Sequence, residues 1–202
     1  TILYDSNKII LSGVLPNENT QGMQFASVIN IQTDGNLQNT TNATSVQKAK
    51  EIVLKISAAT NYNFTKGGLT QDNVLQKANN YLQKTTILFD NAIKESQKAY
   101  QLLFNRNRWY NTKNTNTTTL STFERLQQFY KGEKDALLPI LYYNFGRYLL
   151  ISSSREGLLP ANLQGLWAEE YQTPWNGDYH LNINIQMNYW LAEATNLSEL
   201  TE

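Results

Sequence analysis

The sequence predicts an α+β fold, with strands over roughly the first third and helices over the remainder. Two observations support this prediction. Between residues 23 and 32, side chains alternate with a period of two, which is typical of a half-buried strand. After the pair Gly67-Gly68, apolar residues recur at spacings of three and four, which is typical of amphipathic helices. The change of period therefore separates a β part from a helical part.

Three segments of the β part have strand character, and we expect strands at 8–15, 23–31 and 51–58. The turn signal Asp34-Gly35 ends the second of them. Residues 37–45 are polar and rich in Asn and Thr, so we expect a hairpin or an exposed loop there. Because three or four strands leave open sheet edges, this part should be the tail of a larger β-domain.

The helical part should begin with one long helix or two consecutive helices over residues 72–108, followed by a polar linker at 111–119. A second buried helix is expected from about Gln186 to Leu197. The stretch from Gly157 to Trp175 has no periodicity and predicts a long structured loop. Buried helices separated by long loops are typical of an α/α toroid, whose loops build a site at one mouth.

Capping patterns mark two further helix starts. Ser121, with Glu124 three residues later, has the spacing of a capping box. Asp135 can cap a helix that runs from Ala136 to about Ser153. That second helix is apolar nearly all round, which is typical of a helix buried on several sides.

Composition narrows the possible functions. Lys plus Arg and Asp plus Glu both total 17, so the net charge is near zero and argues against a nucleic-acid or anionic-membrane partner. With no cysteine and one histidine, thiolate and histidine-cluster metal sites are excluded, and no metal or cofactor is expected. No apolar run approaches the roughly 20 residues of a membrane span. The plentiful Tyr, Trp and Asn suit a carbohydrate ligand, although a biased genome gives the same composition.

The segment from His180 to Gln186 alternates polar and apolar residues. If it is extended, His180, Asn182 and Asn184 project to one side and form a row of neutral hydrogen-bonding groups that suits a sugar and a water. If it is helical, the two asparagines diverge and cannot share a small ligand. A purely structural alternative is a buried strand end whose amides satisfy backbone groups.

The densest family signal lies in the run FGRYLLISSSR…LPANLQGLW followed by PWNGDYHLNINIQMNYW. These stretches resemble the start of the catalytic (α/α)6 barrel of glycoside hydrolase family 95, the inverting α-L-fucosidases. The resemblance implies three parts: residues 1–65 as the tail of an N-terminal β-sandwich domain, 66–120 as a helical linker, and 121–202 as the first helices of the barrel. Since the chain starts at Thr1, we expect it to be a piece of a longer chain.

The resemblance also implies roles for individual residues. The two asparagines that hold the attacking water in the family carry over to Asn182 and Asn184, and the residue lining the fucose site carries over to His180. The family's general-acid Glu and its partner Asp match no residue here, so we expect this piece alone to be inactive. Trp167 either stacks on the sugar or anchors a loop, and Asp178 is expected to support the loop.

The function implied is hydrolysis, with inversion, of terminal α-linked L-fucose, with α-1,2 as the expected linkage. The partner would be a fucosylated oligosaccharide or polysaccharide, and the enzyme would be periplasmic, cell-surface or secreted. Alternatives are an α-L-galactosidase of the same family, against which His180 argues, and a non-catalytic carbohydrate-binding or scaffold module. A toroidal polysaccharide lyase is a further alternative, disfavoured because its uronate substrate needs a basic patch.

Overall fold

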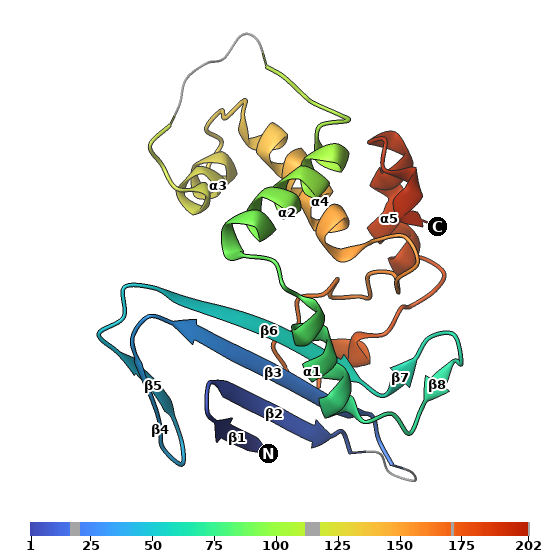
Figure 1. Ribbon diagram of the computed structural model, residues 1–202. Helices are drawn as coiled ribbons and strands as arrows, with labels where there is room; N and C mark the ends of the chain where they lie inside the picture. Colours follow the sequence, from blue (N-terminus) through green and yellow to red (C-terminus); the bar gives the residue numbers. More distant parts are fainter. Residues whose placement is uncertain (17–20, 112–117, 171, 202) are drawn as a thin grey trace. The chain divides into compact units, whose positions relative to one another are not determined.

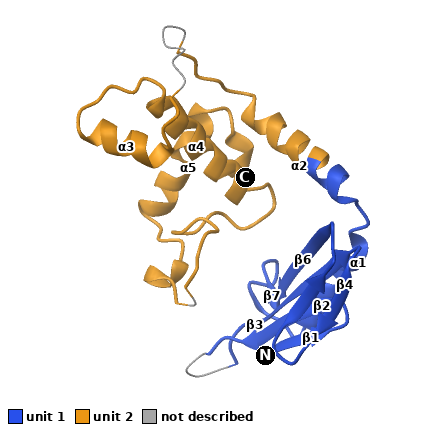
Figure 2. Ribbon diagram, turned by 90° about the vertical axis from the view of Figure 1, so that its left-hand side faces the viewer, with its two compact units in different colours: residues 1–93 blue, residues 94–202 orange. Residues whose placement is uncertain are grey.

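The computed structural model describes residues 1–16, 21–111, 118–170 and 172–201. It is an α+β structure that divides into two compact units, residues 1–93 and residues 94–202 (Figure 2). Antiparallel strands build most of the first unit, and helices with long loops build the second (Figure 1). The expected linker at 111–119 lies largely outside the described residues.

The first unit contains a four-stranded antiparallel sheet with the strand order β1-β2-β3-β6. Its strands are β1 (Ile2–Asp5), β2 (Lys8–Val14), β3 (Gln24–Thr33) and β6 (Ile52–Thr60). The three strands expected from the alternation are therefore confirmed, with ends shifted by a few residues. Two small antiparallel pairs accompany this sheet: β4 (Asn36–Asn39) with β5 (Thr44–Gln47), and β7 (Tyr62–Asn63) with β8 (Gly68–Leu69).

The turn predicted at Asp34-Gly35 is present and connects β3 to β4. The Asp34 carboxylate accepts hydrogen bonds from the backbone N–H groups of Lys50 (2.9 Å) and Glu51 (3.1 Å), and the bond from Glu51 is the main reason that its pKa is lowered. A Cβ on Gly35 would lie 2.6 Å from the carbonyl oxygen of Gln47, so the close approach of two backbone segments requires glycine there.

Helix α1 (Val74–Lys84) covers one face of the sheet (Figure 1). Val74 and Ala78 on the helix pack against buried residues of β3 and β6, and the Ser57 hydroxyl donates to the carbonyl of Ala78 at 2.8 Å. On the opposite face, β6 presents a row of apolar side chains, and among the described residues these remain more than half exposed: Ile52, Leu54 and Ile56. Within the described residues of the first unit, the sheet is thus covered on one side only.

The second unit is built from helices. Its elements are α2 (Phe89–Phe104, which crosses the unit boundary), α3 (Thr122–Tyr130), α4 (Leu138–Ser153), α5 (Asn184–Ala194) and the short 3₁₀ helices Pro174–Gly177 and Ser198–Thr201. In the described part of residues 121–202, strand pairing is limited to one isolated bridge. The core is formed by buried residues of α4, α5 and the C-terminal segment, namely Leu150, Ile151, Ala192, Leu197 and Leu200.

Arg147 is the largest completely buried side chain of the helical unit. Its guanidinium donates to the carbonyl oxygens of Leu103, Phe104 and Asn107 at 2.8–3.2 Å, and it lies 5.1 Å from the centre of the Phe104 ring. These bonds hold backbone carbonyls at the end of α2 and in the segment that follows it.

The composition of α4 predicts a helix that is buried on several sides, and this prediction is wrong. One side of α4 is exposed. Tyr142 is 79% exposed and Phe145 is 52% exposed, because no other described segment covers this side of the helix. Between α3 and α4 lies an open apolar groove of about 600 Å³, lined by residues that include Leu126, Phe129 and Phe145.

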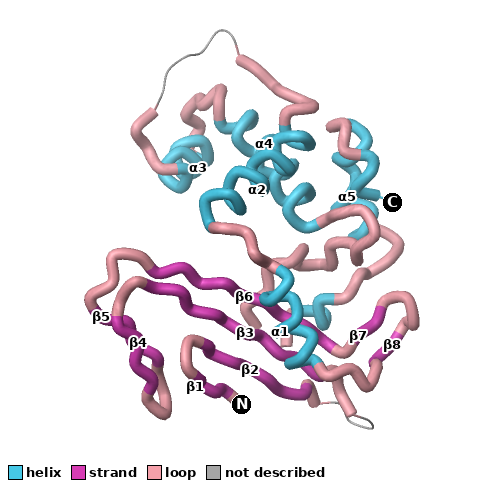
Figure 3. Tube along the Cα trace, in the orientation of Figure 1, coloured by secondary structure: helices cyan, strands magenta, loops and turns pink. Residues whose placement is uncertain are grey.

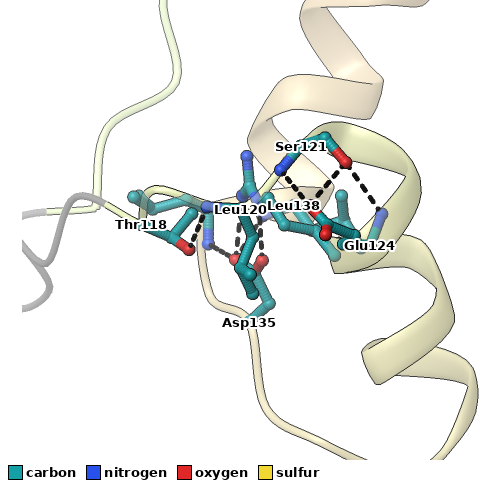
Figure 4. Close-up of polar contacts among 8 residues, drawn as sticks. Thr118, Leu120, Ser121, Glu124, Asp135 and Leu138 are labelled. Carbon is teal, nitrogen blue, oxygen red and sulfur yellow. Dashed lines mark hydrogen bonds and ion pairs between the residues drawn. The ribbon is translucent and has the colours of Figure 1, made fainter.

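The capping box predicted at Ser121 is present, and Asp135 binds backbone N–H groups at the start of α4 although the N-cap residue of that helix is Leu137 (Figure 4). Ser121 and Glu124 form a reciprocal capping box at the start of α3. The Asp135 carboxylate accepts from the N–H groups of Leu137 and Leu138 at 3.0 Å and pairs with both Nε and Nη2 of Arg125, at 2.7 and 3.0 Å. The Arg125 guanidinium lowers the pKa of Asp135 to about 2. This carboxylate therefore joins the start of α4 to α3.

We expect Asp135→Asn to lower the free energy of unfolding near neutral pH, by on the order of 1 kcal/mol. The folded-state pKa lies below the ordinary value of 3.8, so the charge stabilises the fold above about pH 4 and stops doing so as the pH falls through about 2. Urea unfolding of wild type and variant at pH 7, 5, 4 and 3 should show a difference that shrinks below pH 4. Glu133→Gln, at an exposed position nearby, is the control. A difference that is constant with pH would contradict this assignment.

Candidate functional site

The candidate residues lie in the long connection between α4 and α5, which is drawn as loop over most of its length (Figure 3). The prediction of a structured loop from Gly157 to Trp175 is confirmed for the described residues. The regular secondary structure of its described residues is limited to one isolated bridge and one 3₁₀ turn. Hydrogen bonds between loop segments therefore hold it in place. The site is therefore built on irregular backbone held by neighbouring side chains.

A left-handed turn forms the centre of this connection. Trp175, Asn176 and Gly177 have φ values of 55°, 57° and 59°. A left-handed backbone costs a non-glycine residue roughly 1–2 kcal/mol, and such strain persists only where the surroundings enforce it. Two hydrogen bonds hold the turn. The backbone N–H of Asn176 donates to the carbonyl of Thr173 (3.0 Å), and the side-chain amide of Gln164 donates to the carbonyl of Pro174 (3.1 Å).

His180 follows this turn and contacts two side chains. Its backbone N–H donates to the Oδ1 atom of Asp178 at 3.1 Å, and its ring Nδ1 contacts the same oxygen. The indole of Trp175 meets the imidazole edge to face, with centroids 5.7 Å apart. His180 is thus held by an acidic and an aromatic neighbour, and its side chain remains 36% exposed.

Of the two arrangements considered for residues 180–186, the extended one is not found, and the helical one holds only from Asn184 onward. His180 and Asn182 have φ values of 23° and 82°, residues 181–183 form a turn, and α5 already begins at Asn184. Alternation of polar and apolar residues predicts a strand only where a neighbouring strand supplies hydrogen bonds. Here the N–H of Ile185 returns to the carbonyl of His180 at 3.3 Å and closes a turn instead.

Asn182 and Asn184 are both exposed, two residues apart, at the entry to α5. Among the residues that the structure describes, neither side-chain amide has a hydrogen-bond partner. Asparagine tolerates the left-handed region better than most residues, which fits Asn182. Both amides are therefore available to a ligand or a water.

Helix α5 fixes the loop on which the left-handed turn rests. The Tyr189 hydroxyl accepts from the N–H of Ala161 at 2.7 Å and pairs with the Ser154 hydroxyl at 2.8 Å. The Asn188 amide donates to the carbonyl of Asn162 at 3.1 Å. These two residues were not predicted as part of the site, and their only signal in the sequence is their position shortly after the His-x-Asn-x-Asn motif.

Trp167 lies on the same connection but apart from the contacts of His180. Its side chain is 49% exposed, and its ring packs over Gly165, where an added Cβ would lie 2.8 Å from the indole. The backbone N–H of Trp167 donates to the carbonyl of Gln164 at 3.1 Å. The ring is therefore partly anchored by the loop and partly open to a ligand.

Among the described residues, Asp178 is the carboxylate that contacts His180. Glu169, Glu170 and Glu193 are exposed, and in the described part of the chain none of them forms a hydrogen bond or ion pair with the motif. Arg155 donates to the carbonyls of Ile151 and Ser154. The described residues contain no group of three or more side chains suited to a metal ion. No described helix is long and apolar enough to cross a membrane.

Comparison with known proteins gives two family matches. Residues 88–202 match the model of the glycosyl hydrolase family 95 catalytic domain, and residues 2–65 match the glycosyl hydrolase family 65 N-terminal domain. The first match contains the left-handed turn, His180 and both asparagines.

Three curated relatives are similar over most of this chain. One from Aspergillus niger, named probable alpha-fucosidase A, is 40% identical over 76% of the chain and 20% of its own length. Alpha-L-fucosidase 2 of Arabidopsis thaliana is 35% identical over 93% of the chain and 23% of its own length. A probable alpha-fucosidase A of Aspergillus oryzae is 32% identical over 98% of the chain and 29% of its own length. The chain therefore spans less than a third of each relative.

We expect Gly177→Ala to destabilise the left-handed turn. Alanine at φ 59° is strained, and its Cβ would lie 2.7 Å from the Thr173 hydroxyl oxygen. The loss should be about 1–2 kcal/mol, read as a lower midpoint of thermal unfolding. Gly146→Ala in α4 is the control, because nothing lies within 4 Å of its Cβ and the helix favours alanine. Equal midpoints for both variants would show that the turn is not constrained as described.

Proposed function

The chain belongs to glycoside hydrolase family 95, and on that premise we propose that it forms part of an enzyme that removes terminal α-linked L-fucose from glycans. The relatives named as fucosidases support the choice of sugar. The matched catalytic-domain model supports hydrolysis as the reaction. In this proposal the linkage is α-1,2 and the anomeric configuration is inverted.

One observation carries the proposal: a short strained segment before α5 gathers amides, an imidazole–carboxylate contact and the exposed indole of Trp175. Backbone strain clusters at sites where the fold fixes functional groups. Neutral hydrogen-bonding groups beside an exposed indole suit a neutral sugar, whose hydroxyls donate and accept and whose ring has an apolar face. The segment lies wholly within the residues matched by the catalytic-domain model.

Asn182 and Asn184 hold the attacking water in this proposal. A carboxamide does not accept a proton at neutral pH, so the pair orients and polarises the water while a carboxylate takes its proton. A general acid protonates the leaving oxygen, and inversion follows because the water attacks the opposite face of the ring. We place both carboxylic groups elsewhere in a longer chain.

His180 and Trp167 bind the sugar. The imidazole contacts a hydroxyl or the methyl side of fucose, and the exposed part of the Trp167 indole stacks on an apolar face. No metal or cofactor takes part. The substrate is a fucosylated oligosaccharide or polysaccharide, which places the enzyme in the periplasm, on the cell surface or outside the cell.

The proposal assigns three regions to the chain. Residues 1–65 form the C-terminal part of an N-terminal β-sandwich, 66–120 the helical linker, and 121–202 the first helices of an (α/α)6 barrel. The sheet with one open face and the helices with exposed apolar sides support this assignment, because a sandwich and a barrel each cover such faces.

Asn184→Ala in the full-length enzyme should lower kcat by on the order of 10²-fold or more, because one positioning contact to the attacking water is lost. Release of L-fucose from 2′-fucosyllactose measures this. Asn80→Ala, at an exposed position of α1, is the matched control and should leave kcat unchanged. A near-normal kcat for Asn184→Ala would refute the water-positioning role. The wild-type enzyme would instead be an α-L-galactosidase if it released L-galactose from an α-L-galactoside in preference to L-fucose from the corresponding fucoside.

The 202-residue chain alone should release no measurable fucose, because it lacks both proton-transfer groups. Loss of general acid and general base catalysis lowers the rate by about 10²–10⁴-fold each. The assay compares equal concentrations of the chain and the full-length enzyme, with circular dichroism to show that helices are present. A comparable rate would place the acid and base within these residues, with Asp178, Glu169 and Glu193 as the candidates.

A further inference from the structure

The Oδ1 atom of Asp178 meets His180 twice. It accepts the backbone N–H of His180 at 3.1 Å and contacts the Nδ1 atom of the imidazole. The first contact closes a tight turn of the kind that Asp and Asn both form. The second contact is specific to the ring. A single oxygen therefore fixes both the backbone and the side chain of His180.

A carboxylate oxygen can only accept a hydrogen bond, so the Nδ1 atom that meets it carries the proton. In the neutral ring, Nε2 is then left as an acceptor. The edge-to-face contact with Trp175 adds a second constraint on the ring plane. The contact with Asp178 thus determines which nitrogen of His180 faces outward and what it can bind.

Asp178 is itself held by backbone bonds. Its carbonyl accepts from the N–H of Leu163 at 3.1 Å, and its N–H donates to the carbonyl of Trp175 at 3.3 Å. The loop that contains Leu163 is fixed to α5 through Asn188 and Tyr189. The helix that begins with Asn184 therefore also sets the position of the carboxylate that orients His180.

We propose that Asp178 is a positioning residue, which holds the His180 ring with Nδ1 protonated so that Nε2 accepts a hydrogen bond from a hydroxyl of the sugar. This role rests on the proposed function, because it assigns His180 a hydroxyl of the bound sugar. It gives Asp178 no contact with the reacting atoms. Its effect is on sugar binding, and it acts through the imidazole.

The first test uses the full-length enzyme and its ring tautomer, which does not depend on activity. With ¹⁵N-labelled histidine, the ring signals of His180 are assigned by their loss in His180→Gln. We expect the Nδ1-protonated tautomer in wild type and a mixture of both tautomers in Asp178→Ala. A wild-type ring protonated on Nε2 would overturn the proposal even if the enzyme releases fucose.

The second test separates the ring contact from the turn. Asparagine can still close the backbone turn, but it replaces a charge-assisted hydrogen bond by a weaker neutral one. We expect Asp178→Asn to raise KM for 2′-fucosyllactose about tenfold with kcat nearly unchanged, and Asp178→Ala to raise it further. Asp72→Asn, at an exposed position in the first unit, is the control. Wild-type KM in Asp178→Asn would show that Asp178 only shapes the turn.

A double-mutant cycle tests whether Asp178 acts through His180. In the His180→Gln background, Asp178→Asn should change KM by less than twofold. A full tenfold effect in that background would overturn the proposal, because Asp178 would then act on the sugar or the fold directly. If wild-type enzyme releases no L-fucose at all, the proposed function fails, whereas the tautomer measurement still decides the contact between Asp178 and His180.

Discussion

The positive φ values at Trp175, Asn176, Gly177, His180 and Asn182 are the constraint on which the rest of the candidate site depends. Residues in this conformation do not hold it by themselves, and here the hold comes from a neighbouring loop and from α5. The loop is bonded to Tyr189 and Asn188, and the turn is bonded to the loop. Helix α5 therefore supplies one amide of the candidate site and also the contacts that shape the rest of it. A site of this kind should lose its geometry as a unit when α5 shifts.

Much of the architecture could be predicted from local patterns. The alternation around Phe25 and Ile29 predicted β3, and the spacing of Ser121 and Glu124 predicted a capping box, because both patterns are decided within a few residues. The start of α5 was predicted near Gln186 rather than at Asn184, since His180 to Gln186 alternates like a strand. The closing bond from Ile185 to His180 and the left-handed φ of Asn182 decided the outcome. The role of Tyr189 could not be predicted from local patterns, because its partners lie 28 and 35 residues away.

Both units expose apolar faces of a kind that stable proteins normally cover. In the first, the face carries Ile52, Leu54 and Ile56, and in the second it carries Tyr142 and Phe145. Large contiguous apolar surfaces mark places where further protein packs. In the proposed longer enzyme, a second sheet and later barrel helices would cover these faces. The same features explain why α4 is apolar nearly all round although this chain buries only part of it.

The buried guanidinium of Arg147 also bears on the order in which the chain matures during translation. The carbonyls that it binds at the end of α2 lie 40 to 44 residues earlier in the sequence. At roughly 5–20 residues per second, a ribosome needs about 2–9 seconds to add that many residues. During this interval the carbonyls at the end of α2 lack the guanidinium that binds them in the folded structure, because Arg147 has not yet been synthesised. The helix end and α4 are therefore expected to become ordered together, after Arg147 has left the exit tunnel.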